Sequence, residues 1–108
     1  MGGDPVVARG QVRWLLLDKP RPVVLLNRAA VIDRLEHLLV APCTSRVRSL
    51  PTEVALDETD GMPKACVVSA DNLTLVDREA LGATITSLSE EKLQAICQAL
   101  AVATGCEQ

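Results

Sequence analysis

Aromatic residues are almost absent from the sequence, which has one Trp, no Phe and no Tyr among its 108 residues. RNA-recognition motifs and OB-folds hold single-stranded nucleic acid by stacking bases on several exposed aromatic rings. The aromatic-lined peptide groove of an SH3-type binding module also needs more than one such ring. Any nucleic acid must therefore be bound through Arg, Lys, hydroxyl groups and backbone amides.

Histidine and cysteine patterns that bind metals or carry out catalysis are also missing. The sequence has a single histidine, His37, so the protein is not a ribonuclease that uses two histidines as acid and base. We expect His37 to be structural. The four cysteines lie 23, 31 and 9 positions apart and contain no Cys-x-x-Cys pair, which matches no zinc pattern. We expect no metal site, no cofactor, and reduced thiols that are mostly buried.

Long apolar runs are absent as well. None approaches the roughly 18 residues that a membrane span requires. Asp4, Pro5 and Arg9 interrupt the apolar stretch that a signal peptide would need, so we expect a cytoplasmic protein without membrane contact. With 48% apolar and 23% charged residues, the chain is predicted to form a single domain over residues 1–108, with a flexible N-terminus at 1–8.

The charge is unevenly distributed along the chain. The net charge is -3, yet residues 1–48 hold eight Lys and Arg against four Asp and Glu, a net of +4. Residues 49–108 hold three against ten, a net of -7. An acidic protein can present a basic face, so a nucleic-acid or phosphate partner is not excluded. A solvated mixture of charges with no target explains the same numbers.

Short apolar runs separated by turn residues predict five or six strands, at 11–17, 23–26, 36–44, 52–56, 65–70 and 83–88. Pro42 indicates that the third strand bends or runs along an edge. The fifth strand is expected to run on into residues 71–75.

The connections between these strands have simple predicted structures. Asn27 is expected to cap a short helical piece at 28–34, and residues 57–63 are predicted to be a loop. Residues 77–81 are predicted to form a turn or a single helical turn that Gly82 ends.

A C-terminal helix is the most clearly marked element. Ser89 is a suitable N-cap, two glutamates follow it in the first turn, and Gly105 fits the C-terminal end. An apolar stripe is predicted from the helical spacing of Leu93, Ile96, Cys97 and Leu100. The fold class is therefore mainly β with minor α, a small barrel of short strands with one packed helix.

Seven segments occur in a recognisable order over about residues 9–106: Arg9-Gly10-Gln11-Val12, Arg21-Pro22-Val23-Val24-Leu25-Leu26, Val40-Ala41-Pro42-Cys43-Thr44-Ser45, Leu50-Pro51-Thr52-Glu53-Val54, Gly61-Met62, Val67-Val68-Ser69-Ala70-Asp71-Asn72, and Thr84-Ile85-Thr86-Ser87-Leu88-Ser89. In this order they resemble the MazF/PemK (Kid-like) toxins, the mRNA interferases of bacterial type II toxin-antitoxin pairs. The resemblance implies an SH3-like barrel of the CcdB/PemK type, with five to seven short strands and a C-terminal helix.

The same resemblance implies a homodimeric endoribonuclease that cleaves single-stranded RNA at short sequences without a metal and so inhibits translation and growth. The RNA is messenger RNA, or structured loops of tRNA or rRNA. A MazE-like antitoxin with an acidic, extended C-terminal tail would lie across the RNA groove and compete with the substrate.

Site residues follow from the matching positions. Arg21 and Thr44 stand where the family has catalytic residues, and Asp71 stands at an acidic position that some members use. The predicted RNA-binding residues flank these three: Lys19, Arg28, Ser45, Arg46, Arg48 and Asn72. Taken without the family, the three catalytic candidates also fit a surface loop residue, a strand-end cap and a turn former.

Metal-free RNA cleavage defines three tasks for these side chains. The ribose 2′-OH must lose a proton, the charged phosphorane must be stabilised, and the leaving 5′-oxygen must be protonated. Arg21 suits phosphorane stabilisation first and general-acid catalysis second, because its guanidinium fork binds phosphate and is a poor proton donor. Thr44 can hydrogen-bond the 2′-OH or a phosphate oxygen, and Asp71 is the candidate general base.

Two features depart from the family pattern. Only Lys19 and Pro20 stand between Asp18 and Arg21, where many members have a long loop that borders the RNA groove. The usual Asp-Gln-x-Arg sequence reads Asp71-Asn72-Leu73-Thr74, so Arg46 or Arg48 would have to replace the missing arginine. An alternative of another class is a CcdB-like toxin that binds and poisons DNA gyrase without nuclease activity.

Overall fold

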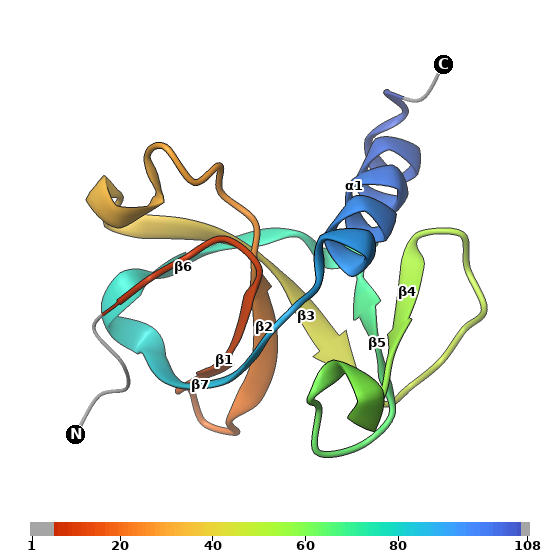
Figure 1. Cartoon of the computed structure of the whole chain (residues 1–108), viewed down its shortest axis with the longest axis horizontal. Coiled ribbons are helices and arrows are strands. Elements are labelled where there is room, and N and C mark those ends of the chain that lie inside the picture. The colour runs from red at the N-terminus through yellow and green to blue at the C-terminus, as the bar shows by residue number, and fades with distance from the viewer. Residues whose placement is uncertain (1–5, 107–108) are drawn as a thin grey trace.

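The computed structural model describes residues 6–106, which form a curved antiparallel sheet and one long helix (Figure 1). The strands are β1 Gln11–Leu15, β2 Arg21–Leu25, β3 His37–Thr44, β4 Glu53–Leu56, β5 Cys66–Ser69, β6 Thr74–Asp77 and β7 Leu81–Ser87. Single 3-10 turns are η1 Ile32–Arg34, η2 Glu58–Asp60, η3 Ala70–Asn72 and η4 Arg78–Ala80, and the helix is α1 Glu90–Thr104. The predicted fold class, mainly β with a C-terminal helix, is confirmed.

Strand β3 is the centre of the sheet. The strand order is β4-β5-β3-β2-β1-β7, and β6 also pairs with β3. The first half of β3 pairs with β6, from His37 to Val40, whereas Cys43 and Thr44 pair with β5. Pro42 lies between the two pairings, where β3 exchanges one neighbour for the other. The alternative of an edge strand is wrong, because β2 pairs with the opposite side of β3.

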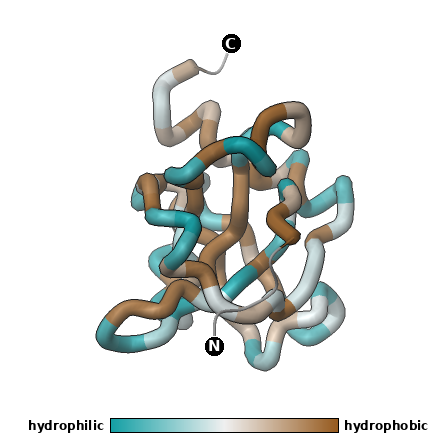
Figure 2. The backbone as a smooth tube through the Cα atoms, turned by 90° about the vertical axis from the view of Figure 1, so that its left-hand side faces the viewer, coloured by the Kyte–Doolittle hydropathy of each residue, from teal (hydrophilic) through white to brown (hydrophobic). Residues whose placement is uncertain are grey.

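Both faces of the central strands are buried, which explains why β2 reads as an unbroken apolar run. Val24 belongs to a core under α1 that includes Ile96, whereas Val23 and Leu25 belong to a second core that includes Leu38. In Figure 2 apolar segments run through the middle of the molecule, and most of the hydrophilic segments lie towards its periphery. The two cores therefore pack the sheet on both of its faces.

The helix ends where the sequence predicts. Ser89 accepts a hydrogen bond from the Lys92 amide at 3.2 Å, and Gly105 closes the helix in the left-handed conformation at φ 72°. The predicted apolar stripe is wrong in one residue, because Cys97 is exposed and Ala99 is buried instead. Of the four cysteines, Cys43 and Cys66 are buried and the other two are exposed, so burial of most thiols was also a wrong prediction.

Two connections differ from their predictions. Residues 28–34 form only η1, and Asn27 does not cap it, because its side chain accepts a hydrogen bond from the Leu39 amide at 2.7 Å. Strand β5 does not run on into residues 71–75. The chain turns through η3 and starts β6, which pairs with the other half of β3.

Strand boundaries and one loop differ as well. β1 ends at Leu15, two residues earlier than predicted, and residues 57–63 contain η2. Gly82 does not end an element but lies buried within β7, where a Cβ would come within 3.0 Å of the Leu16 side chain. Close approach of a neighbouring side chain therefore explains this glycine better than a break in the chain.

The N-terminal prediction falls partly on residues 1–5, which lie outside the described residues. Val7 is buried, and the Val6 carbonyl accepts hydrogen bonds from the side chains of Gln11 and Arg13. Within residues 6–106, no helix is long and apolar enough to cross a membrane.

Candidate functional site

Two adjoining cavities lie at the ends of β2, β3 and β5. The first, here called the arginine cleft, has a volume of about 310 Å³, and its lining includes Arg21, Thr44, Arg46, Arg48, Asp71 and Asn72. The second, the cysteine cleft, has about 320 Å³, and its lining includes Lys19, Arg21, Cys43, Thr44, Ser45 and Cys66. Arg21, Cys43 and Thr44 line both cavities. The two clefts therefore meet at two of the predicted catalytic residues.

Strand register explains why these residues meet. Val23 of β2 is paired with Pro42 of β3, and the same antiparallel register carried two residues further sets Arg21 opposite Thr44. Thr44 is paired on its other side with Val67 of β5. The η3 turn directly follows β5, and its residues Asp71 and Asn72 line the arginine cleft beside Thr44. Residues far apart in sequence therefore line one site.

Arg28 is the one predicted site residue that lines neither cleft. It follows β2, whereas Arg21 begins that strand, so the strand separates the two side chains. His37, predicted to be structural, begins β3 at the opposite end from Thr44. Its side chain is exposed and lines a third, smaller cavity with Asp77 and Arg78.

Hydrogen bonds orient the two polar residues predicted to act on the ribose. The Thr44 hydroxyl oxygen accepts from the Arg46 amide at 3.1 Å, which leaves its O–H hydrogen available to donate to a substrate. Asp71 is exposed, and its Oδ2 accepts from the hydroxyl of buried Thr52 at 2.6 Å. The Asn72 side chain donates to Ser69 Oγ at 2.7 Å. The Asp71 carboxylate is thus held in place while it remains open to solvent.

Sequence reasoning missed Glu53, which shapes the basic loop of the arginine cleft. Its carboxylate accepts hydrogen bonds from the amides of Arg48 and Leu50, at 3.1 and 3.2 Å. Ser49 between them adopts the left-handed conformation at φ 57°. Paired amides of this kind form a concave anion site. Glu53 fills this concavity and fixes the backbone that carries Arg48.

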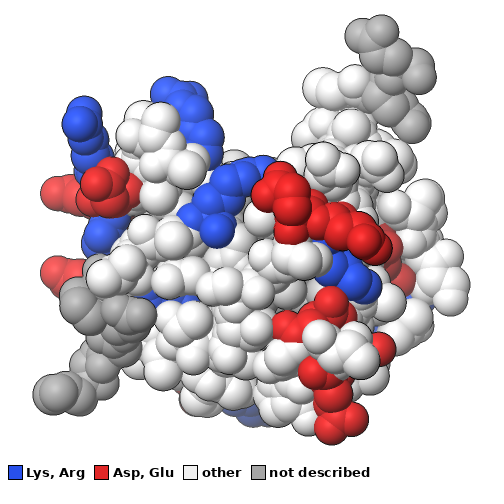
Figure 3. Space-filling view, viewed as in Figure 1, with Lys and Arg blue, Asp and Glu red and all other residues white. Residues whose placement is uncertain are grey.

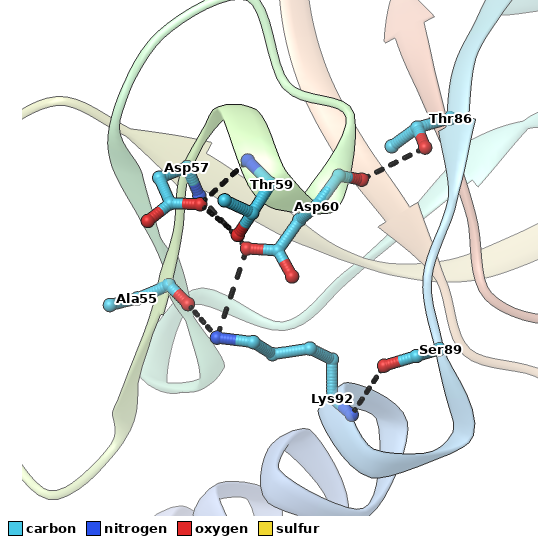
Figure 4. A network of polar contacts seen from close by, with 7 residues as sticks. All are labelled: Ala55, Asp57, Thr59, Asp60, Thr86, Ser89 and Lys92. Carbon is cyan, nitrogen blue, oxygen red and sulfur yellow. Dashed lines mark hydrogen bonds and ion pairs between the residues drawn. The ribbon is translucent and has the colours of Figure 1, made fainter.

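A polar network supports the far wall of the cysteine cleft (Figure 4). Lys92 of α1 donates to the Ala55 carbonyl at 2.7 Å and lies 3.8 Å from the Asp60 carboxylate. The Asp60 carbonyl accepts from the Thr86 hydroxyl at 2.9 Å. Hydrogen bonds from Thr59 hold the pKa of the exposed Asp57 carboxyl below its usual range. The network fixes η2, after which Met62, Pro63 and Lys64 line the cleft.

Several acidic side chains gather on one part of the surface, outside the two clefts. On the face shown in Figure 3, basic and acidic side chains mix on the left, whereas acidic ones predominate over β4, η2 and the start of α1. The sequence places Glu58 and Asp60 in η2 and Glu90 and Glu91 in the first helical turn. Part of the acidic half of the sequence is therefore gathered around η2 and the start of α1.

The site can hold a phosphate but has little with which to hold a metal. Arg21 offers a planar fork of donors where the clefts meet, Thr44 offers a hydroxyl donor beside it, and further arginines line one cleft. Within residues 6–106, no group of three or more His, Cys, Asp or Glu side chains is arranged to bind a metal ion. Fold and site together define a small β-protein with a groove suited to a phosphodiester.

Comparison with known proteins identifies the family. Residues 8–104 match the family described as PemK-like, MazF-like toxin of type II toxin-antitoxin system, and the chain belongs to it. Probable endoribonuclease MazF5 of Mycobacterium tuberculosis is 39% identical over 104 residues, which cover 94% of this chain and 95% of that protein. Endoribonuclease MazF3 of the same organism is 39% identical over 84 residues, which cover 78% of this chain and 82% of that protein.

Solved structures agree with this assignment. Mycobacterium tuberculosis toxin MazF-mt6 matches with a TM-score of 0.84 and 35% identity, over 91% of this chain and 99% of that one. MazE-MazF from Deinococcus radiodurans matches with a TM-score of 0.79 and 26% identity, over 94% and 98%. The predicted family is confirmed. The gyrase-binding alternative is not favoured, because the curated relatives are named endoribonucleases.

Proposed function

We propose that the chain is a sequence-specific endoribonuclease toxin that cleaves single-stranded RNA without a metal. The 2′-OH attacks the adjacent phosphate, which leaves a 2′,3′-cyclic phosphate and a 5′-hydroxyl. The observation that supports this most strongly is the meeting of two clefts at Arg21 and Thr44. A strand of RNA that crosses from one cleft to the other brings a phosphate to the junction, beside both side chains.

Each side chain has one role in this proposal. Arg21 binds the phosphate oxygens and stabilises the negative charge that grows on them in the phosphorane. Thr44 donates its hydroxyl hydrogen to the substrate and so positions the ribose or phosphate. Asp71, oriented by Thr52, accepts the 2′-OH proton. Arg46, Arg48, Lys19, Ser45 and Asn72 contact the neighbouring phosphates and riboses.

The partners follow from the family and the site. A cognate antitoxin with an acidic, extended tail would occupy the arginine cleft and exclude RNA, because the tail is negatively charged as the RNA backbone is. The working form is a homodimer in the cytoplasm, and residues 1–108 act as one domain. The five residues between β1 and β2 form a short connection, which leaves the cysteine cleft open beside Lys19.

The direct test is incubation of the purified chain with mixed-sequence RNA in EDTA, followed by sequencing of the new 5′ ends. We expect cleavage at a short recurrent sequence. Cleavage that requires added metal contradicts the mechanism. Intact RNA together with trapped gyrase-DNA complexes in arrested cells would instead assign the chain to the gyrase-binding class.

The basic loop is expected to contribute affinity. Replacing Arg46 and Arg48 together with alanine should weaken RNA binding and reduce the slope of log K against log salt by roughly 0.7 for each lost phosphate contact. Arg28→Ala is the matched control, since Arg28 is exposed and lines neither cleft. Equal salt slopes for the double variant and the wild type would remove these arginines from the RNA site.

Asp71→Asn tests the assignment of the base. General-base catalysis contributes about 100-fold to 10,000-fold, so kcat should fall by at least about 100-fold. The control is Asp33→Asn, which changes an exposed carboxylate on η1 that lines neither cleft. Single-turnover cleavage measures the effect, and an unchanged rate for Asp71→Asn would show that another group takes the proton.

A further inference from the structure

Cys43 and Cys66 lie in the cysteine cleft and have no part in the proposed reaction. Both line the cleft, and both belong to the core under α1. Cys66 is 8% exposed and Cys43 is 5% exposed, so small reagents can reach them only through the cleft. The other two cysteines are exposed, Cys97 on α1 and Cys106 beyond its end.

Strand pairing brings the two buried thiols together. Cys43 near the end of β3 is paired with Val68 of β5, and Cys66 begins β5 two residues before Val68. Alternate residues of a strand share a face, so the two cysteines are diagonal neighbours on one side of the sheet. Both side chains also line the cysteine cleft, and each thiol is the largest influence on the pKa of the other.

This contact makes the two thiols unequal. The hydrogen bond from Cys43 lowers the pKa of Cys66 to about 7, with help from the charge of Lys64 and against burial and the charge of Asp60. The same hydrogen bond, with burial, raises the pKa of Cys43. A thiolate is the reactive form of cysteine. Cys66 is therefore the nucleophile of the pair, and Cys43 is the resolving cysteine.

We propose that Cys66 is a thiol-modification site for low-molecular-weight disulfides, and that its reaction ends in a Cys43–Cys66 disulfide that inactivates the enzyme. The Cys66 thiolate attacks one sulfur of the reagent disulfide, forms a mixed disulfide and expels one reagent thiolate. Cys43 then loses its proton to that thiolate, attacks the Cys66 sulfur and expels the second reagent thiolate. The two cysteines are oxidised, and one reagent disulfide is reduced to two thiols.

The new bond would move the catalytic strand end. Diagonal neighbours have Cα atoms about 7–8 Å apart, whereas a disulfide needs about 4.4–6.8 Å. The ends of β3 and β5 must therefore approach each other, and Thr44 directly follows Cys43 at that end. A misplacement of about 1 Å in an active site can lower the rate by about 100-fold. This loss of activity rests on the proposed function, whereas formation of the disulfide does not.

The test uses the full chain with Cys97→Ser and Cys106→Ser, so that only the buried pair can react. This protein is treated with oxidised glutathione and then with dithiothreitol. Peptide mapping identifies which cysteines are free thiols and which form disulfides. The rate of RNA cleavage in EDTA measures activity. We expect a Cys43–Cys66 disulfide, at least about tenfold slower cleavage, and recovery on reduction. Cys66→Ser and Cys66→Ala on the same background should form no disulfide, and oxidised glutathione should leave the rate of each unchanged.

Two results would overturn the proposal. One is a buried pair that keeps two free thiols, or only a stable glutathione adduct, after treatment. The other is a complete Cys43–Cys66 disulfide with undiminished cleavage. If the reduced protein does not cleave RNA at all, the proposed function fails, and peptide mapping still decides whether the disulfide forms.

Discussion

Replacing Arg21 with alanine is expected to lower kcat/KM for RNA by about 1,000-fold, because a positioned cation at the transferring phosphate contributes effects of that size. Arg21 begins β2 and is exposed, so its removal leaves both cores intact. The fold should therefore survive, and circular dichroism and the unfolding midpoint should match those of the wild type. Single-turnover cleavage of an RNA that contains the mapped site measures the loss.

Two further variants serve as controls for Arg21→Ala. Arg21→Lys keeps the charge but loses the planar fork, so it should recover only part of the rate. Arg28→Ala removes an arginine outside both clefts and should cleave RNA like the wild type. Full activity in Arg21→Ala would place the catalytic site elsewhere on the molecule.

Gly61→Ala is expected to destabilise the fold by about 3 kcal/mol, which lowers Tm by more than about 10 °C. Gly61 caps η2 in the left-handed conformation at φ 92°, which costs energy for any residue with a Cβ. A Cβ on residue 61 would also clash with the Thr86 side chain, because it would lie 2.8 Å from the Thr86 Cβ. Thermal unfolding followed by circular dichroism measures the shift.

A double variant tests the clash with the Thr86 hydroxyl. Gly61→Ala with Thr86→Ala removes the hydroxyl, which is the atom nearest the new methyl group, but keeps the Cβ contact at 2.8 Å and the strained backbone, so its loss should be smaller than the sum of the single losses by about 1 kcal/mol. Thr86→Ala alone loses its hydrogen bond to the Asp60 carbonyl. Strictly additive losses would show that Thr86 does not meet the new methyl group.

Local patterns predicted the parts of the fold that local interactions determine. The end signals of α1, Ser89 and Gly105, act within one helical turn and are in place. Asn27 and Gly82 were misread because their environment comes from distant residues, namely the Leu39 amide and the Leu16 side chain. A turn-forming residue in sequence can equally serve a tertiary contact, and composition alone does not distinguish the two uses.

The candidate site was predictable only in part. The resemblance supplied Arg21 and Thr44, and strand register then brings them together. No pattern pointed to Glu53 or Thr52, because their roles lie in hydrogen bonds to loop amides and to a carboxylate 19 residues away. Arg28 was included because it is near Arg21 in sequence, yet β2 lies between them.

The most direct test of the account is cleavage, in EDTA, of an RNA oligonucleotide with a single 2′-deoxy nucleotide on the 5′ side of the scissile phosphate. The account predicts no cleavage at that position, while the all-RNA oligonucleotide gives a 2′,3′-cyclic phosphate and a 5′-hydroxyl. Cleavage of the 2′-deoxy substrate at the same phosphate would show that water, rather than the ribose hydroxyl, is the nucleophile, and would contradict the mechanism assigned to Arg21, Thr44 and Asp71.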